Sequence, residues 1–270
     1  MQKSIFVVPV FILLAVLCVF LGCDPSSSSS SSTSSTSTSS TGGCNTSSSS
    51  SSSTSSTSST SSSSGSGGIT GASCTSTGTV TVTDTIRVTS GTYDGQCKTY
   101  VPVGMGDGGQ GEDQKPVFRV ENGATLKNVI IGSPGVDGIH LYNGATLDNV
   151  TWKDVGEDAC TVKSSGTYTI KNIEGYNSED KFFQVNAAST INVSNCIIKT
   201  AGKALRQNGG TTFKIAVTFD RCDIADMNEG IFRTDSSSST ARITNSRLHN
   251  AGDICIGNWA SCTSSGITYY

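Results

Sequence analysis

A short sequence pattern recurs six times in the C-terminal part of the chain, and it limits the possible folds more than any other feature. In each copy, alternating apolar and polar residues lead to an asparagine, or once to an arginine, and a second short apolar run follows. The corner positions are Asn128, Asn149, Asn172, Asn195, Arg221 and Asn245, separated by 21, 23, 23, 26 and 24 residues. Repeats of this length with period-two alternation predict a solenoid whose coils consist of short parallel strands joined by tight corners.

The recurring asparagine has a structural explanation. Asparagine tolerates the left-handed backbone conformation of a tight corner, and stacked asparagine side chains can hydrogen-bond along the solenoid axis. Leucine-rich repeats have a similar period, but their regularly spaced leucines are absent here. We therefore interpret the asparagine column as holding the coils together, and we expect equivalent residues of neighbouring coils to lie about 4.8 Å apart.

Two segments of different composition precede the repeats. Residues 1–22 contain one early cation, Lys3, and an apolar run from Ile5 to Leu21, which is typical of a secretory signal peptide. A single spanning helix is the alternative, because about 20 apolar residues can cross a bilayer. Residues 23–68 are dominated by Ser and Thr and predict a disordered linker, since they offer little apolar surface to offset the entropy of ordering. The folded domain is expected at residues 69–270, in a secreted, extracellular and monomeric protein.

The overall charge of the chain indicates which kinds of partner it is unsuited to bind. The formal net charge of −3 favours neither nucleic acid nor an anionic membrane as a partner. We therefore expect no nucleic-acid binding, and no membrane association of the mature chain unless Cys23 carries a lipid. An anionic polymer would need a local cluster of cations.

The ten cysteines and the export signal together indicate an oxidising compartment. Seven of them fall in the predicted domain, so one is expected to be free or to pair with Cys44. Cys196 and Cys222 each follow a corner residue by one position in adjacent coils, which should bring their side chains close enough to bond. We predict a disulfide between them.

Aligning the second strand of each coil produces a column of charged residues. Four carboxylates crowd onto adjacent coils, namely those of Asp137, Glu157, Asp158 and Asp180. Like charges at this spacing repel, and a bound divalent cation would remove the conflict. A set of carboxylate oxygens suits Ca²⁺. The alternative is a solvated acidic turn paired with nearby lysines.

Cations follow the carboxylates directly. Lys181 and Lys203 occupy the same column, and Gln184, Arg206 and Arg233 lie three residues further along their strands. A patch with an acidic, metal-binding end and a basic end suits a polyuronate, whose carboxylates can contact both Ca²⁺ and Lys or Arg. Strict strand alternation would place Arg206 on the opposite face from Lys203, so a shared face requires the strand to bend between them.

At these positions the chain resembles the class III pectate lyases of polysaccharide lyase family 3. The resemblance spans about Thr79 to Asp253, in the order and spacing of that family. The matching segments are Gln114-Lys-Pro-Val-Phe, Gly123-Ala-Thr-Leu-Lys-Asn-Val-Ile-Ile-Gly132, Val136-Asp-Gly-Ile-His140, Asp154-Val-Gly-Glu-Asp-Ala159, Asp180-Lys-Phe-Phe-Gln184 and Gly202-Lys-Ala-Leu-Arg206. The turn Gln207-Asn-Gly-Gly210 departs from the cysteine-containing turn that often follows in the family.

The resemblance implies an all-β fold, a right-handed parallel β-helix, with calcium at the carboxylate cluster. It further implies specific roles for residues of this chain. The implied metal ligands are Asp137, Glu157 and Asp158, the implied catalytic pair is Lys181 and Arg206, and Lys163 and Lys203 match positions that hold substrate carboxylates. Arg233 joins the substrate-binding set from its place at the basic end.

The implied activity is calcium-dependent cleavage of de-esterified polygalacturonate by β-elimination. The proton at C5 of galacturonate is weakly acidic, and cations at the adjacent carboxylate stabilise the charge that develops when this proton leaves. We assign Lys181 as the base and Arg206 as the carboxylate clamp, with the reverse open, because Arg is almost always protonated. The alternatives are a β-helix polygalacturonan hydrolase, which needs an acid and a base carboxylate, and a non-catalytic solenoid that binds cell-wall polysaccharide.

Overall fold

The structure is a computed structural model that describes residues 68–111 and 113–270. These residues form sixteen strands and no helix, and every strand pair is parallel. The strands are β1 (Thr79–Val82), β2 (Ile86–Val88), β3 (Thr92–Pro102), β4 (Phe118–Val120), β5 (Thr125–Ile131), β6 (Ile139–Leu141), β7 (Thr146–Trp152), β8 (Asp158–Val162), β9 (Gly166–Val185), β10 (Ser189–Gln207), β11 (Ile215–Thr234), β12 (Thr240–Thr244), β13 (Arg247–His249), β14 (Asp253–Gly257), β15 (Ser261–Ser265) and β16 (Thr268–Tyr269).

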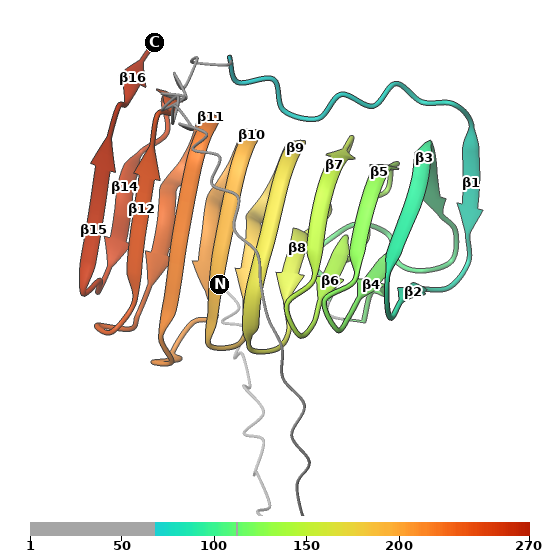
Figure 1. The fold of residues 1–270 in the computed structure, drawn as a ribbon, viewed down its shortest axis with the longest axis horizontal. Helices are drawn as coiled ribbons and strands as arrows, with labels where there is room; N and C mark the ends of the chain where they lie inside the picture. Colours follow the sequence, from blue (N-terminus) through green and yellow to red (C-terminus); the bar gives the residue numbers. More distant parts are fainter. Residues whose placement is uncertain (1–67, 112) are drawn as a thin grey trace, which may run out of the picture. The chain divides into compact units, whose positions relative to one another are not determined.

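Successive coils stack side by side along one axis (Figure 1). One face has the strand order β1-β3-β5-β7-β9-β10-β11-β12-β15, and a second row runs β2-β4-β6-β8 and joins the far ends of β9, β10, β11 and β14. The long strands β9, β10 and β11 bend around the coil, so a single strand contributes to more than one face. The parallel β-helix predicted from the repeat is confirmed.

The asparagine column marks one row of corners, as predicted. All six corner residues have positive φ, between 51° at Asn195 and 59° at Asn149. The Asn149 side chain donates to Asn128 Oδ1 over 2.8 Å, and the Asn195 side chain donates to Asn172 Oδ1 over 2.9 Å. A second row of positive-φ residues lies five positions further along the coils and consists of Asn177, Thr200, Asp226 and Asn250. Asparagine therefore stabilises both corner geometry and coil stacking.

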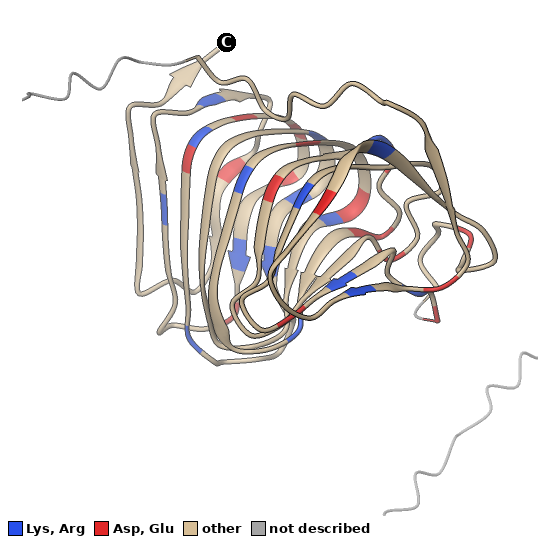
Figure 2. Ribbon diagram, turned by 45° about the vertical axis from the view of Figure 1, so that its right-hand side comes forward, with Lys and Arg blue, Asp and Glu red and all other residues tan. Residues whose placement is uncertain are grey.

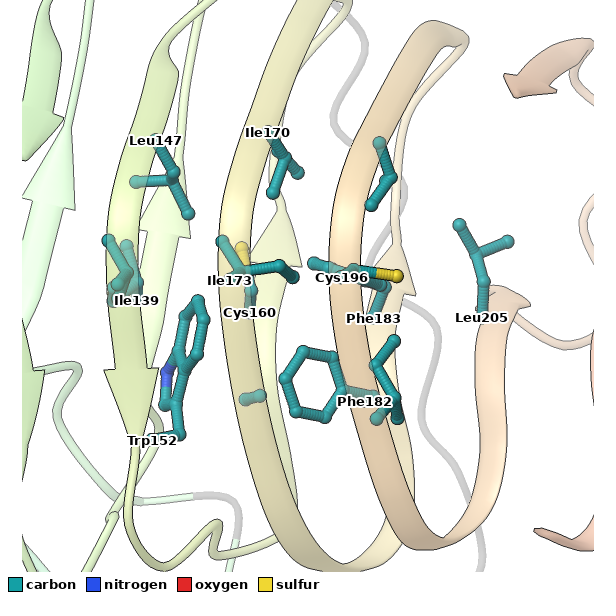
Figure 3. Close-up of a cluster of buried hydrophobic side chains, with 14 of the residues drawn as sticks. Ile139, Leu147, Trp152, Cys160, Ile170, Ile173, Phe182, Phe183, Cys196 and Leu205 are labelled. Atoms are coloured by element: carbon teal, nitrogen blue, oxygen red, sulfur yellow. The ribbon is translucent and has the colours of Figure 1, made fainter. Parts of the chain in front are cut away.

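Apolar side chains fill the interior of the coil. Figure 3 shows Trp152, Phe182 and Phe183 pointing into this core between neighbouring coils. Their ring centroids are 5.3 Å apart for Trp152 and Phe182 and 5.0 Å apart for Phe182 and Phe183, in edge-to-face geometry. Fully burying such a side chain contributes roughly 1.5–3 kcal/mol, so the repeated inward positions account for much of the driving force for coiling.

Three disulfides connect the described residues. Cys196 and Cys222 are bonded across adjacent coils, with a Cα–Cα distance of 4.5 Å, which confirms the predicted pair. Cys74 bonds to Cys97, and Cys255 bonds to Cys262. Cys160 is a buried thiol, and it is the free cysteine within residues 68–111 and 113–270. The predicted leftover cysteine of the domain is thereby identified.

An extended segment, residues 68–78, crosses the corners of several coils before β1 begins (Figure 1). The backbone N–H groups of Thr70 and Ser73 donate to Asn195 Oδ1 and Asn149 Oδ1 over 2.8 and 2.7 Å. The Cys74–Cys97 disulfide then joins the segment to β3. We call residues 68–78 the corner strap.

The predicted signal peptide and almost all of the predicted linker lie outside the described residues. Within the part of the chain that the structure covers, no helix has the length and apolar character needed to cross a membrane.

Candidate functional site

The predicted column of charged residues is present in the strand register. Asp158 of β8 pairs with Lys181 of β9, Lys181 with Lys203 of β10, and Lys203 with Gly230 of β11. Asp137 lies two residues before β6, whose Ile139 pairs with Cys160 of β8. Side chains separated by 66 residues in the sequence therefore project from four consecutive coils.

The bend that Arg206 requires is produced by pairs of inward-facing residues. Phe182 and Phe183 are both buried in the core, so Lys181 and Gln184 on either side of them both face outward. Ala204 and Leu205 do the same between Lys203 and Arg206. Two consecutive inward positions break the period of two, and this is why residues three apart share a face at this corner.

A pocket of about 410 Å³ opens on this face. It contains the three predicted metal ligands, both predicted catalytic residues and one of the predicted substrate-binding lysines. Its lining residues are Gly111, Gln114, Asp137, Glu157, Asp158, Thr161, Lys163, Lys181, Gln184, Asn186, Arg206, Asn208 and Gly209. The structure thus brings Asp137, Glu157, Asp158, Lys163, Lys181 and Arg206 into a single cavity.

The Lys181 ammonium lies among the carboxylates at the acidic end. Its Nζ is 2.6 Å from Asp180 Oδ2 and 3.5 Å from both Glu157 Oε1 and Asp158 Oδ1. Burial lowers the pKa of Lys181, but the charges of Asp158 and Asp180 outweigh burial and leave the pKa raised. The side chain of Lys181 is 10% exposed, so the pocket holds a protonated amine that is largely removed from solvent.

Asp158 is a buried carboxylate whose ionised form is disfavoured by its surroundings. Burial raises its pKa to about 7, and the charges of Glu157 and Asp137 add to the rise while Lys181 opposes it. Asp158 Oδ1 is buried and accepts no hydrogen bond. Additional positive charge at this point would stabilise the ionised form, so the acids fit a divalent cation. Among the described residues, however, no three acidic, His or Cys side chains already form a metal-ligand group.

Asp137 has a partner within its own coil. Its Oδ2 is 2.8 Å from Nε2 of His140, a buried residue. Burial, opposed by Asp137, lowers the pKa of His140. The buried imidazole therefore contacts the Asp137 carboxylate from within the same coil.

Lys203 and Arg233 do not line the pocket, unlike the other predicted site residues. The side chain of Lys203 is 5% exposed, and its Nζ lies 2.6 Å from both Asp180 Oδ1 and Glu229 Oε1. Arg233 pairs with the other oxygen of Glu229. Acidic and basic residues occur together on neighbouring coils (Figure 2), and the contacts with Asp180 and Glu229 satisfy the charge of Lys203 internally.

Arg206 also lines the pocket. Its side chain is 20% exposed, and its Nη2 lies 3.9 Å from Asp235 Oδ2. A methyl group added at Gly209 would approach the same nitrogen to 2.6 Å. The guanidinium therefore packs directly against the turn after β10, and it can offer its remaining donors to a planar anion.

Sequence reasoning gave no role to the amide side chains of the pocket. Asn186 and Asn208 lie five residues after Lys181 and Lys203, and Lys163 lies five residues after Asp158. All three positions line the pocket. The same column alignment that found the charges could have found this second row, had it been extended by five residues.

Comparison with known proteins adds independent information. A family model described as "Pectate lyase" matches residues 70–265. The chain is 41% identical over 138 residues to "Probable pectate lyase E" of Neosartorya fischeri and 39% identical over 140 residues to "Pectate lyase E" of Emericella nidulans. Each match covers 50% of this chain and 54% of the relative, so the chain spans about half the length of these relatives.

A solved structure has a similar fold. The catalytic domain of pectate lyase PelI from Erwinia chrysanthemi superposes with a TM-score of 0.54 at 24% identity. The superposition covers 71% of this chain and 88% of that domain. At this identity the likeness concerns the fold, and it matches the β-helix described above.

Proposed function

Because the chain belongs to the pectate lyase family, we propose that it is a secreted, calcium-dependent pectate lyase that cleaves de-esterified polygalacturonate by β-elimination. The observation that carries the proposal is the composition of the pocket, which is lined by Asp137, Glu157 and Asp158, by Lys181 among these carboxylates, and by Arg206. A neutral sugar has no use for this arrangement. A chain of uronates can present carboxylates to a cation and to basic side chains at once.

Asp137, Glu157 and Asp158 are the residues that would hold Ca²⁺. When bound, the ion would neutralise the substrate carboxylate and so make the adjacent C5 proton more acidic. The buried Asp158, with its raised pKa and its oxygen that accepts no hydrogen bond, is the feature of this chain that supports a cation at this end of the pocket.

Lys181 and Arg206 divide the remaining work between proton abstraction and charge stabilisation. The base takes the C5 proton, the C5–H electron pair forms the C4–C5 double bond, and the C4–O bond breaks. The C4–O electron pair leaves with the glycosidic oxygen, which takes up a proton from solvent and becomes a hydroxyl of the released sugar. Lys181 serves as a base only when deprotonated, and the carboxylates around it raise its pKa. Neutralising those carboxylates with a cation would reverse that effect. Arg206 then binds the substrate carboxylate.

Lys163 is the substrate-binding lysine that the geometry supports best, since it lines the pocket two residues beyond Thr161. Glu229 forms ion pairs with both Lys203 and Arg233. These two side chains could contact a substrate carboxylate only if they first gave up their ion pairs with Glu229. Secretion is supported by the three disulfides, since disulfides persist in oxidising compartments.

A hydrolase acting on the same polymer is the second candidate. The pKa of Asp158, raised to about 7 by burial, is the kind of value that a general-acid carboxyl of a glycosidase needs. The two reactions leave different products. β-Elimination creates a C4–C5 double bond that absorbs ultraviolet light, whereas hydrolysis creates none.

The decisive experiment is an assay of the chain on polygalacturonate with added Ca²⁺, followed at the absorbance of the unsaturated product. We expect product formation that rises toward alkaline pH and stops when a chelator is added, with recovery when Ca²⁺ is restored. New reducing ends without an absorbing product would support the hydrolase, and an inert protein that binds the polymer would support the non-catalytic solenoid.

A further inference from the structure

A row of neutral amide side chains lies beside the charged groups of the pocket. Gln184 is in register with Thr161 and Arg206 on the neighbouring coils. Asn186 and Asn208 follow two residues further along their coils, where their backbone N–H groups donate to Val162 and Val185 over 2.8 Å. All of these side chains line the pocket, and the elimination chemistry proposed above uses none of the amides.

Two carbonyl oxygens of this row have no hydrogen-bond partner. Gln184 Oε1 and Asn186 Oδ1 are both buried, and neither accepts a hydrogen bond from any described residue. Gln184 Nε2 donates to Asn208 Oδ1 over 3.4 Å, which fixes the orientation of the Gln184 amide and leaves its oxygen unpaired. Buried acceptors without a donor are rare in native proteins and destabilise the fold. Their occurrence at a pocket wall indicates that a ligand supplies the donors.

The chemistry of the missing donors follows from the acceptors. A carboxylate has no proton to give to a carbonyl oxygen, and a calcium ion would be held by the carboxylates at the other end. A sugar hydroxyl is a donor of the right kind. We propose that Gln184 and Asn186 accept hydrogen bonds from free hydroxyl groups of the bound uronate, so that the site selects sugars whose hydroxyls are not esterified. This inference rests on the proposed lyase function.

Esterification of a hydroxyl removes the donor, which leaves the amide oxygens buried and unpaired in the complex. Sites built to bond a substrate hydroxyl discriminate strongly against analogues that lack it. We expect kcat/KM on a chemically O-acetylated polygalacturonate to be at least about tenfold below that on the unmodified polymer.

The test compares the wild-type chain with Gln184→Ala and Asn186→Ala on both polymers. Each substitution removes one acceptor, so KM on unmodified polygalacturonate should rise about threefold to tenfold with a smaller effect on kcat. The preference for the unmodified polymer should shrink by a similar factor, because the truncated side chain no longer distinguishes hydroxyl from acetyl. Asn192→Ala, an exposed asparagine of β10 outside the pocket lining, is the matched control and should keep both values.

Thermal unfolding of the same variants separates recognition from a structural role. Removing an unpaired buried acceptor should leave the melting temperature of the free protein unchanged or raise it. A melting temperature lowered by several degrees in both pocket variants would overturn the inference. So would normal KM values, or an undiminished preference for the unmodified polymer, in both variants. If the wild-type chain forms no unsaturated product from either polymer, the proposed function itself has failed.

Discussion

At the scale of single residues, Lys181 and Arg206 are the side chains whose removal should be most costly to activity. Lys181→Ala and Arg206→Ala, made singly, should each lower kcat on polygalacturonate by about 100-fold or more, the range found when a general base or a charge-stabilising donor is removed. The rate of unsaturated product formation measures the loss. Lys153→Ala and Arg242→Ala, which remove exposed cations outside the pocket, should retain full activity.

A conservative substitution can show whether Lys181 or Arg206 is the base. Lys181→Arg keeps the positive charge but replaces an amine that can lose its proton with a guanidinium that cannot. If Lys181 is the base, this variant should be as inactive as Lys181→Ala. Substantial activity in Lys181→Arg would reverse the assignment and make Arg206 the base.

Glu174 predicts a pH-dependent stability on a different face. Burial raises the pKa of this carboxyl above its usual range, opposed by a hydrogen bond from Thr151. A raised pKa means that stability is greatest at low pH and is lost as pH rises through the pKa of the folded state. Glu174→Gln should therefore melt about 1–3 °C above wild type at pH 7 and equal to it near pH 4. The exposed Glu179→Gln is the control, and no gain at pH 7 in Glu174→Gln would contradict the argument.

Much of the candidate site could be predicted from sequence at this scale, because a solenoid converts sequence period into proximity. The column Asp158, Lys181, Lys203 follows from spacing alone, and the register confirms it. The burial of Lys203 could not be predicted this way. It depends on Asp180 and Glu229 meeting one ammonium from two sides, and column alignment gives no information on which way a long side chain turns.

At the scale of elements, the bend between Lys181 and Gln184 depends on Phe182, which in turn depends on a glycine of the same strand. A methyl group added at Gly175 would lie 2.2 Å from the Phe182 ring. Gly175→Ala should destabilise the fold by about 1–3 kcal/mol, as overpacking does, and should lower activity by displacing the neighbour of Lys181. Urea unfolding and the lyase assay measure the two effects. Gly68→Ala, where an added methyl meets no atom within 4 Å, should change neither.

The bends in β9 and β10 could not be predicted from the sequence. Alternation along a strand predicts that residues 203 and 206 face opposite sides. The pairs Phe182–Phe183 and Ala204–Leu205 break this alternation, because both members are apolar and both enter the core. An apolar doublet flanked by polar residues is visible in the sequence, but whether it bends a strand depends on the space inside the coil, which packing alone decides.

At the scale of the whole folded unit, the structure describes residues 68–111 and 113–270. Within it, the corner strap should contribute to the free energy of unfolding even though it forms no strand. Removing the Cys74–Cys97 bond with Cys74→Ser and Cys97→Ser should cost about 2–4 kcal/mol, the usual range for a bond closing a loop of this length. The loss is measured by denaturant unfolding. Hydrogen exchange should accelerate first in β1 and β3, and uniform acceleration across all coils would contradict a local role for the strap.

The coil repeat predicted the parallel β-helix from the sequence alone, since each coil contacts chiefly its neighbours. The strap was not predicted. It has no repeat, and its contacts with Asn149 and Asn195 join residues 76 and 125 positions apart, which no periodic pattern can reveal.

A stack of coils that touch only their neighbours has two free ends, and it can peel open from either one, a turn at a time. The corner strap changes this, because it is bonded to β3 near one end and to corners of β7 and β10 further in. The initial turns cannot then peel away without also tearing contacts from the interior of the stack. The pocket is formed by those interior turns, so the strap should keep fraying of the terminal coils from spreading to the residues that line the pocket.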